Sequence, residues 1–243
     1  MGRFENVTAL ALPVAGAVVA DLGCGPGRLT RALLGAEGGA PAVVHAVDVA
    51  ATLDDDLLLD ARVRAHIADL DRPLPLPDAS LDAAASINVL EHLRDPAAHL
   101  DDVGRLLRPG GRFVLAHSDW DTALFSSVDD RLTRTLIDQW VAHSPGAGAR
   151  VDGFAGRKLL RYADASGLDV ESVHSWADPH RRFDVGSVAW KVATGVLAAA
   201  SADTALSARA AGWVDELRHL ADAGRFLFTV TDVAVVLRKD PTS

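Results

Sequence analysis

Short apolar runs alternate with helical patterns along the first half of the chain, and this alternation constrains the fold more than any other feature. The runs are typical of buried strands, and they cover residues 17–22, 42–47, 63–68, 81–87 and 112–116. In the stretch at residues 96–107, apolar side chains recur at the spacing of one helix face. Strands that alternate with helices predict a doubly wound, mostly parallel α/β sheet that helices cover on both faces.

Glycine and acidic residues follow the first three predicted strands. Residues 21–27 read DLGCGPG, and they connect the first strand to a helix that we expect to begin at Arg28. Glycines permit unusual backbone dihedrals and close ligand approach, and the amides of a helix start favour an anionic group. The loop reads G-x-G-x-G, so its third glycine comes one residue earlier than in the dinucleotide fingerprint. Asp48 and Asp69 end the next two strands, where ligands bind in sheets of this kind.

The second half of the chain has a looser pattern and a different composition. We expect helices at residues 129–141, 154–165, 185–200 and 205–221, and strands at residues 168–173 and 226–237. All five tryptophans lie in this half, at positions 120, 140, 176, 190 and 213, whereas Phe4 is the one aromatic residue among the first 112. We interpret this split as two regions with different roles.

Charge and cysteine content limit the partners and the compartment. The formal net charge is −9 and neither half is basic, so we expect no nucleic-acid partner. Cys24 is the single cysteine, which excludes an internal disulfide and a paired-cysteine metal site. No signal peptide is visible and no apolar run is long enough for a membrane span. These features favour a cytoplasmic protein that contacts no membrane and is a monomer or a homodimer.

Five segments of the chain follow one another in a characteristic order. They read VVADLGCGPGRLT, HAVDVA, HIADL, LPLPDASLDAAASINVLEHLRDP and RLLRPGGRFVLAH, and they lie within residues 17–118. In this order they resemble the class I S-adenosylmethionine-dependent methyltransferases. The resemblance implies a Rossmann-like seven-stranded sheet whose last strand, residues 226–237, is antiparallel and inserted between strands five and six. It also implies a single methyltransferase domain over residues 1–243, with the cofactor core at 17–118 and helical insertions that cover the substrate at 119–150 and 179–225.

The resemblance assigns the site of the cofactor, S-adenosylmethionine, to the ends of the first four strands. It places the methionine part of the cofactor at the glycine loop, the ribose at the second strand and the adenine at the third. The implied cofactor-binding residues are, along the chain, Asp21, Gly23, Cys24, Gly25, Gly27, Asp48 (ribose hydroxyls), Val49 (beside the adenine), Asp69 and Leu70 (adenine) and Asn88 (near the methionine end). Two structural alternatives stay open: Cys24 as a small buried residue whose backbone matters, and Asp69 as a solvated strand end.

Catalytic candidates follow the fourth and fifth strands. Methyl transfer from a sulfonium is an in-line displacement, so the protein mainly aligns the acceptor, and a hydroxyl acceptor also needs a base. We predict His92, His117 and Asp119 as the catalytic residues. The alternatives are that His92 is exposed or packs on Glu91, and that His117 is a structural histidine at the sheet edge.

Trp120 and Asp121 are predicted to contact the substrate, because an aromatic ring beside acidic groups suits a cationic or amine-bearing acceptor. A capped turn explains the same residues without any ligand. We expect Trp190 and Trp213 to pack inside the second half of the chain, because they lie on amphipathic helices. No metal site is predicted, because Asp119 and Asp121 lack a convincing third ligand.

The sequence therefore predicts methyl transfer from S-adenosylmethionine to a small-molecule acceptor, at oxygen or nitrogen, with secondary metabolism as one setting. A protein or peptide methyltransferase is the first alternative. A non-catalytic module that binds S-adenosylmethionine is the second. A nicotinamide-dependent reductase is the third, and the early third glycine together with the order of the segments speaks against it.

Overall fold

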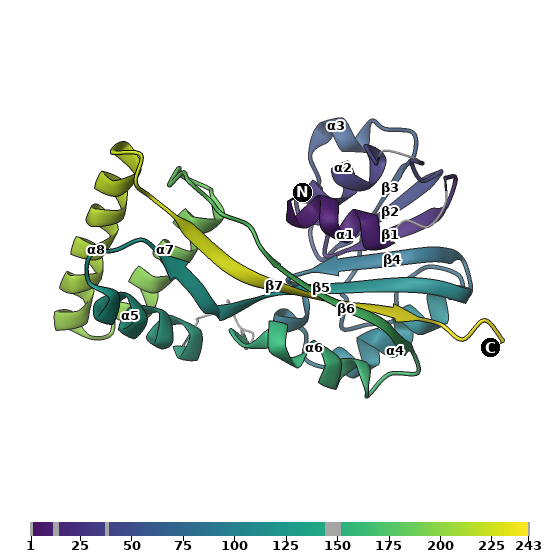
Figure 1. Cartoon of the computed structure of the whole chain (residues 1–243). Coiled ribbons are helices and arrows are strands. Elements are labelled where there is room, and N and C mark those ends of the chain that lie inside the picture. Colours follow the sequence, from purple (N-terminus) through teal and green to yellow (C-terminus); the bar gives the residue numbers. More distant parts are fainter. Residues whose placement is uncertain (1, 12–14, 37–38, 144–151, 243) are drawn as a thin grey trace. The chain divides into compact units, whose positions relative to one another are not determined.

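A computed structural model describes residues 2–11, 15–36, 39–143 and 152–242, and it contains a seven-stranded sheet with the strand order β3-β2-β1-β4-β5-β7-β6 (Figure 1). The strands are β1 (Val18–Leu22), β2 (Val43–Asp48), β3 (Val63–Ile67), β4 (Leu81–Ile87), β5 (Leu107–Phe125), β6 (Asp169–Ala177) and β7 (Phe228–Arg238). The helices are α1 (Arg3–Ala11), α2 (Arg28–Leu34), α3 (Asp55–Leu58), the 3-10 turn η1 (Leu90–His92), α4 (Pro96–Leu106), α5 (Asp130–His143), α6 (Ala155–Ala163), α7 (Val188–Ala200) and α8 (Thr204–Asp222).

The first five strands are parallel, and β7 runs against them. β1 pairs in parallel with β2 and β4, β2 with β3, and β4 with β5. Near the start of β5, the Gly110 amide donates to the Lys239 carbonyl at 3.1 Å, and just past its end the Ser126 amide donates to the Leu227 carbonyl at 2.9 Å. The start of β5 thus lies beside the end of β7 and the end of β5 beside the start of β7, so the two strands are antiparallel. The predicted fold class, with an antiparallel last strand between the fifth and sixth strands, is confirmed.

β5 and α1 differ most from the sequence-based prediction. The fifth strand was predicted over residues 112–116, but β5 is 19 residues long and includes the Pro109-Gly110-Gly111 stretch that reads as a turn. Pairing with β7 accounts for the extension, since a neighbouring strand supplies backbone hydrogen-bond partners that cannot be predicted from the local sequence. Helix α1 was not predicted at all. Its buried side chains Val7 and Ala11 are too few to give a clear period.

The described residues form two compact units. The first unit comprises the described residues up to His117, together with residues 157–175 and 233–242. Its core is built from branched and small side chains around β1, β4 and α4, with Phe113 as the one phenylalanine among its buried residues. This explains the scarcity of aromatic residues in the first half of the sequence, because a sheet that helices cover packs well with small branched side chains.

The second unit consists of the described residues of 118–156 and 176–232. Its core is aromatic: the Phe125 ring lies edge-on to Trp213, with the ring centroids 5.0 Å apart, and Phe226 and Phe228 complete the cluster. Burial of Trp213 agrees with its predicted packing role. Part of the predicted insertion at 119–150 lies outside the described residues. That the insertions at 119–150 and 179–225 cover the substrate stays a prediction. No helix in the described ranges combines the length and the apolarity needed to cross a membrane.

Candidate cofactor-binding site

The glycine loop between β1 and α2 has three left-handed glycines with three different surroundings. A Cβ at Gly23 (φ +80°) would meet a Val89 methyl at 2.3 Å, and one at Gly27 (φ +90°) would meet a Leu57 methyl at 2.2 Å. At Gly25 (φ +50°) an added Cβ would meet no atom of the described chain within 4 Å. Gly23 and Gly27 are therefore glycines for packing, whereas Gly25 is the position where a ligand can approach the backbone.

Asp21 ties the end of β1 to the first turn of α2. One oxygen of its fully buried carboxylate accepts hydrogen bonds from the Thr30 amide at 2.9 Å and from the Thr30 hydroxyl at 2.6 Å. Burial raises the pKa of Asp21 to about 6, although both bonds from Thr30 oppose the shift. Asp21 therefore connects the strand and the helix on either side of the loop. Its carboxylate is charged at neutral pH, although burial disfavours the charged form.

Cys24 lies inside the same loop and is buried. Burial, and then the negative charges of Asp21 and Asp48, raise the pKa of its thiol to about 12. The thiol stays protonated at neutral pH, and a protonated thiol is a poor nucleophile. This environment suits a packing residue whose backbone shapes the loop.

Asp48, at the end of β2, fixes the far side of the loop. Its Oδ2 atom accepts a hydrogen bond from the Gly25 amide at 2.8 Å. A carboxylate has lone pairs left after one such bond, so Asp48 can still accept from two hydroxyl groups of a ribose. The same side chain thus both shapes the loop and offers the acceptor that the resemblance assigns to it.

A cleft of about 420 Å³ opens at the carboxyl ends of β1 to β4 in the first unit, within the usual size of a ligand pocket. Six of the predicted cofactor-binding residues line it: Gly23, Asp48, Val49, Asp69, Leu70 and Asn88. The other four predicted residues do not line it: Asp21 lies near the end of β1, and Cys24, Gly25 and Gly27 belong to the glycine loop. Val49 is 69% exposed, and Asn88 has φ +57°, a left-handed conformation that asparagine tolerates better than most side chains.

The sequence analysis missed Asp71, which also lines the cleft. Its carboxylate accepts hydrogen bonds from the backbone amide of Arg94 at 2.8 Å and from the Arg94 Nε at 3.1 Å. Both bonds lower the pKa of Asp71 against the opposing effect of partial burial. Asp71 therefore joins the segment after β3 to the segment after η1 at the rim of the cleft. An acid two residues after Asp69 was the available signal.

Of the predicted catalytic residues, His92 lies in the wall of the cleft and His117 does not. The His92 side chain is 55% exposed, and partial burial lowers its pKa. His117 is fully buried on β5. The buried carboxylate of Glu91 lies between the two rings, with its Oε1 atom 3.6 Å from His92 Nε2 and 3.7 Å from His117 Nε2. Glu91 was missed as a site residue, although it directly precedes His92 in the sequence.

The three remaining predicted residues lie on β5 in the second unit. Asp119 is buried, and the Trp120 ring packs edge-on against Trp140 with the centroids 5.6 Å apart. The Asp121 carboxylate forms an ion pair with Arg134, which also donates to the Asp121 carbonyl at 2.8 Å. Asp121 is thus already engaged by a cation of the protein. The roles of Asp119, Trp120 and Asp121 toward a substrate stay predictions.

Nothing in the described part of the chain gathers three or more histidine, cysteine or acidic side chains in a geometry that could hold a metal ion. The fit to S-adenosylmethionine rests instead on the open backbone at Gly25, the Asp48 carboxylate and the size of the cleft. When bound, this cofactor supplies a methyl group that its sulfonium activates.

Comparisons with known proteins support the family and the cofactor. A family model described as "Methyltransferase domain" matches residues 20–115. A ubiquinone biosynthesis O-methyltransferase of Xanthomonas oryzae pv. oryzae (strain PXO99A) is 33% identical over 205 residues, which cover 78% of this chain and 81% of that protein. A 37.1 kDa protein encoded in transposon TN4556 of Streptomyces fradiae is 31% identical over 227 residues, and the match covers 91% of this chain.

The chain spans less than two thirds, 62%, of the length of that Streptomyces protein. Among solved structures, an S-adenosylmethionine-dependent methyltransferase from Mesorhizobium loti matches with a TM-score of 0.53 and 22% identity, over 98% of this chain and 99% of that one. The structural match supports the fold, and the 33% identity over most of both chains supports the family. The chain belongs to the class I S-adenosylmethionine-dependent methyltransferases, whose cofactor is S-adenosylmethionine.

Proposed function

We propose that this chain transfers the methyl group of S-adenosylmethionine to a hydroxyl or amine of a small molecule. The observation that carries the proposal is a histidine in the wall of the cofactor cleft. His92 lines the same cleft as Gly23, Asp48 and Asn88, and its ring is half exposed. A base can act on an acceptor only where the acceptor meets the cofactor, and the position of His92 in the wall of the cleft supports this role.

The protonation state of His92 suits this role. Partial burial lowers its pKa below the usual value of 6.5, so the ring is neutral at pH 7 and has a free lone pair. With S-adenosylmethionine bound, the cofactor would supply its activated methyl group to the acceptor oxygen, and His92 would take up the proton that this hydroxyl loses. Glu91, whose Oε1 atom lies 3.6 Å from His92 Nε2, stabilises the imidazolium that forms. An amine acceptor that arrives neutral needs the same alignment without this proton transfer.

A hydroxyl acceptor is favoured by one relative. The Xanthomonas oryzae protein is named an O-methyltransferase of ubiquinone biosynthesis, and the match covers most of both chains. The acceptor of the present chain is part of the proposal, as are a small-molecule partner, a cytoplasmic location, and a monomer or homodimer. A protein or peptide acceptor and a non-catalytic S-adenosylmethionine-binding module are the competing functions.

Calorimetry and a transfer assay test the proposal in two steps. We expect the protein to bind S-adenosylmethionine and S-adenosylhomocysteine but not NAD; binding of NAD alone overturns the cofactor assignment. The protein is then incubated with methyl-labelled cofactor and a panel of phenols, alcohols, amines and peptides. Label on a small molecule supports the proposal, label on peptides alone supports the first alternative, and tight binding without transfer supports the second.

Variants then test the base. His92→Ala should lower turnover of a hydroxyl acceptor by about 10²–10⁴-fold, the usual contribution of general base catalysis, with little change in cofactor affinity. In the wild type, kcat/KM should rise with pH through a pKa below 6.5 and then level off, because neutral His92 is the active form. His219→Ala, at an exposed histidine on α8, is the matched control. Equal turnover in both variants would show that His92 is not the base.

A further inference from the structure

The segment between β3 and β4 begins in the cofactor cleft but has no regular structure to hold it in place. Residues 68–80 contain three prolines and form neither helix nor strand. Asp69, Leu70 and Asp71 line the cleft, while Leu74 and Leu76 are buried in the core of the first unit. Since no helix or sheet fixes the backbone of this segment, another element must supply its hydrogen-bond partners.

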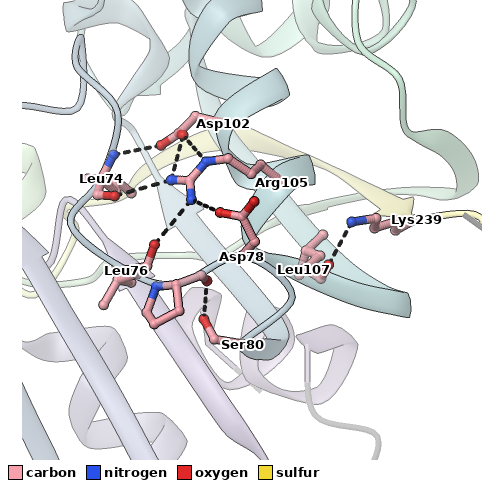
Figure 2. A network of polar contacts seen from close by, with 9 residues as sticks. Leu74, Leu76, Asp78, Ser80, Asp102, Arg105, Leu107 and Lys239 are labelled. Carbon is pink, nitrogen blue, oxygen red and sulfur yellow. Dashed lines mark hydrogen bonds and ion pairs between the residues drawn. The ribbon is translucent and has the colours of Figure 1, made fainter.

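Helix α4 supplies them from a single face. His99, Asp102 and Arg105 are spaced three residues apart, so their side chains lie along one side of the helix; we call these three residues the α4 stripe. Figure 2 shows two of these residues, Asp102 and Arg105. Asp102 accepts a hydrogen bond from the Leu74 amide at 2.8 Å, and Arg105 donates to the carbonyls of Leu74 and Leu76 at 3.1 Å each.

Ion pairs hold this part of the stripe together. Arg105 pairs with Asp102 at 2.8 Å and with the carboxylate of Asp78 at 2.5 Å (Figure 2). The guanidinium thus uses its donors on two backbone carbonyls and two carboxylates at once, a geometry that lysine cannot reproduce. The end of the segment that lies away from the cleft is therefore fixed firmly against α4.

His99 forms the end of the stripe at the cleft. Its Nδ1 atom lies 3.2 Å from the carbonyl oxygen of Leu70, and because a carbonyl only accepts, Nδ1 must carry the proton. The Nε2 atom is buried and has no hydrogen-bond partner among the described residues, and the ring lies edge-on to Phe113. The ring is therefore neutral with one defined tautomer, since a second proton would be buried without an acceptor.

We infer that His99 is a positioning residue for the cofactor: by holding the Leu70 carbonyl, it sets where Asp69 and Leu70 meet the adenine. The contact of Asp71 with Arg94 holds the same segment from the side of η1, so the two residues after Asp69 are fixed from both sides. The inference rests on binding of S-adenosylmethionine and not on methyl transfer. A binding assay therefore tests it whether or not the proposed chemistry is correct.

The test compares S-adenosylhomocysteine with its deaminated analogue, in which an oxo group replaces the adenine amino group. Wild-type protein should prefer the first ligand, because the adenine amino group is predicted to donate a hydrogen bond to Asp69, which lines the cleft. The variant His99→Leu fills the buried position with an apolar side chain but loses the hydrogen bond to the Leu70 carbonyl. Its affinity for S-adenosylhomocysteine should fall about fivefold, the order expected for one hydrogen bond, while its affinity for the analogue stays within about twofold.

Three further measurements separate positioning from simple loss of stability. His99→Asn retains an N–H donor and should recover part of the preference. Arg112→Met removes the ion pair with Glu171, which lies away from the cleft, and should lower stability without changing the preference. In the wild type, nitrogen chemical shifts of His99 should show a proton on Nδ1 alone. An unchanged ratio of the two affinities in both His99 variants, or an equal change in Arg112→Met, would overturn the inference.

Discussion

Alanine at Gly25 should separate the stability of the fold from its capacity to bind the cofactor. Gly25 has φ +50°, and a Cβ added there would meet no described atom of the protein within 4 Å. Gly224, which follows α8 in the second unit, has φ +66° and equally open surroundings. The two substitutions therefore impose the same kind of backbone strain, but only Gly25 belongs to the predicted cofactor-binding residues.

The expected magnitudes follow from this comparison. A left-handed conformation costs a residue with a Cβ about 1–2 kcal/mol, so each variant should lose about 2–8 °C in Tm for a chain of this size. At position 25, in the loop that the resemblance assigns to the methionine part of the cofactor, we expect the methyl group also to overlap the ligand. Inserting a methyl into a filled site costs about 1–3 kcal/mol, and a central value of about 2 kcal/mol corresponds to about a 30-fold loss of affinity.

Thermal unfolding and calorimetry with S-adenosylhomocysteine measure the two effects independently. Gly25→Ala and Gly224→Ala should have similar Tm values, and only the first should bind the ligand weakly. If Gly25→Ala bound within threefold of the wild type, the loop would not be the place where the ligand approaches the backbone. An equal loss of affinity in Gly224→Ala would show that strain, and not contact with the ligand, governs binding.

Three other substitutions test single contacts. Asp48→Ala should weaken binding of S-adenosylmethionine by at least about tenfold in calorimetry, because charge-assisted hydrogen bonds to the ribose are lost; unchanged affinity in a folded variant refutes the ribose role. Asp21 has a pKa of about 6 in the folded state against an ordinary value of 3.8, so it favours the folded state in acid, and this contribution is lost as the pH rises from 3.8 to about 6. Denaturation at several pH values should show that Asp21→Asn flattens this fall, and an identical pH dependence in wild type and variant contradicts the burial argument. Thr133→Val should lower the free energy of unfolding by about 1–3 kcal/mol, because the buried Trp213 indole N–H loses its acceptor at 3.0 Å, whereas Thr133→Ser should restore most of it.

The parts of the fold that the sequence predicts are those in which local pattern and tertiary packing agree. β4 matches its predicted bounds, residues 81–87, because its apolar run is buried in the core. β5 does not, since its extension to Phe125 depends on pairing with β7, a strand more than a hundred residues later in the chain. A contact over that separation leaves no mark in a local window of the sequence.

The residues of the candidate site likewise divide into those that the sequence predicts and those that it does not. Asp48 and Asp69 end apolar runs and could be placed at the edge of the sheet from the sequence alone. Glu91 and His99 could not be recognised, because their meaning comes from what they face: two histidine rings in one case and the carbonyl of Leu70 in the other. A single buried acid or histidine has no periodicity, so its partner is visible only once the backbone is placed.

The distribution of tryptophan makes intrinsic fluorescence a probe of one unit of the chain. All five indoles belong to the second unit, whereas the cofactor cleft lies entirely in the first, whose one phenol is Tyr162. Tryptophan emission therefore records the second unit alone. A change in emission when S-adenosylhomocysteine is added would mean that ligand binding in the cleft alters the surroundings of tryptophans in the second unit. Unchanged emission would mean that it does not. Melting curves followed by tryptophan emission and by backbone circular dichroism would likewise diverge if the two units unfold separately, and coincide if they unfold together.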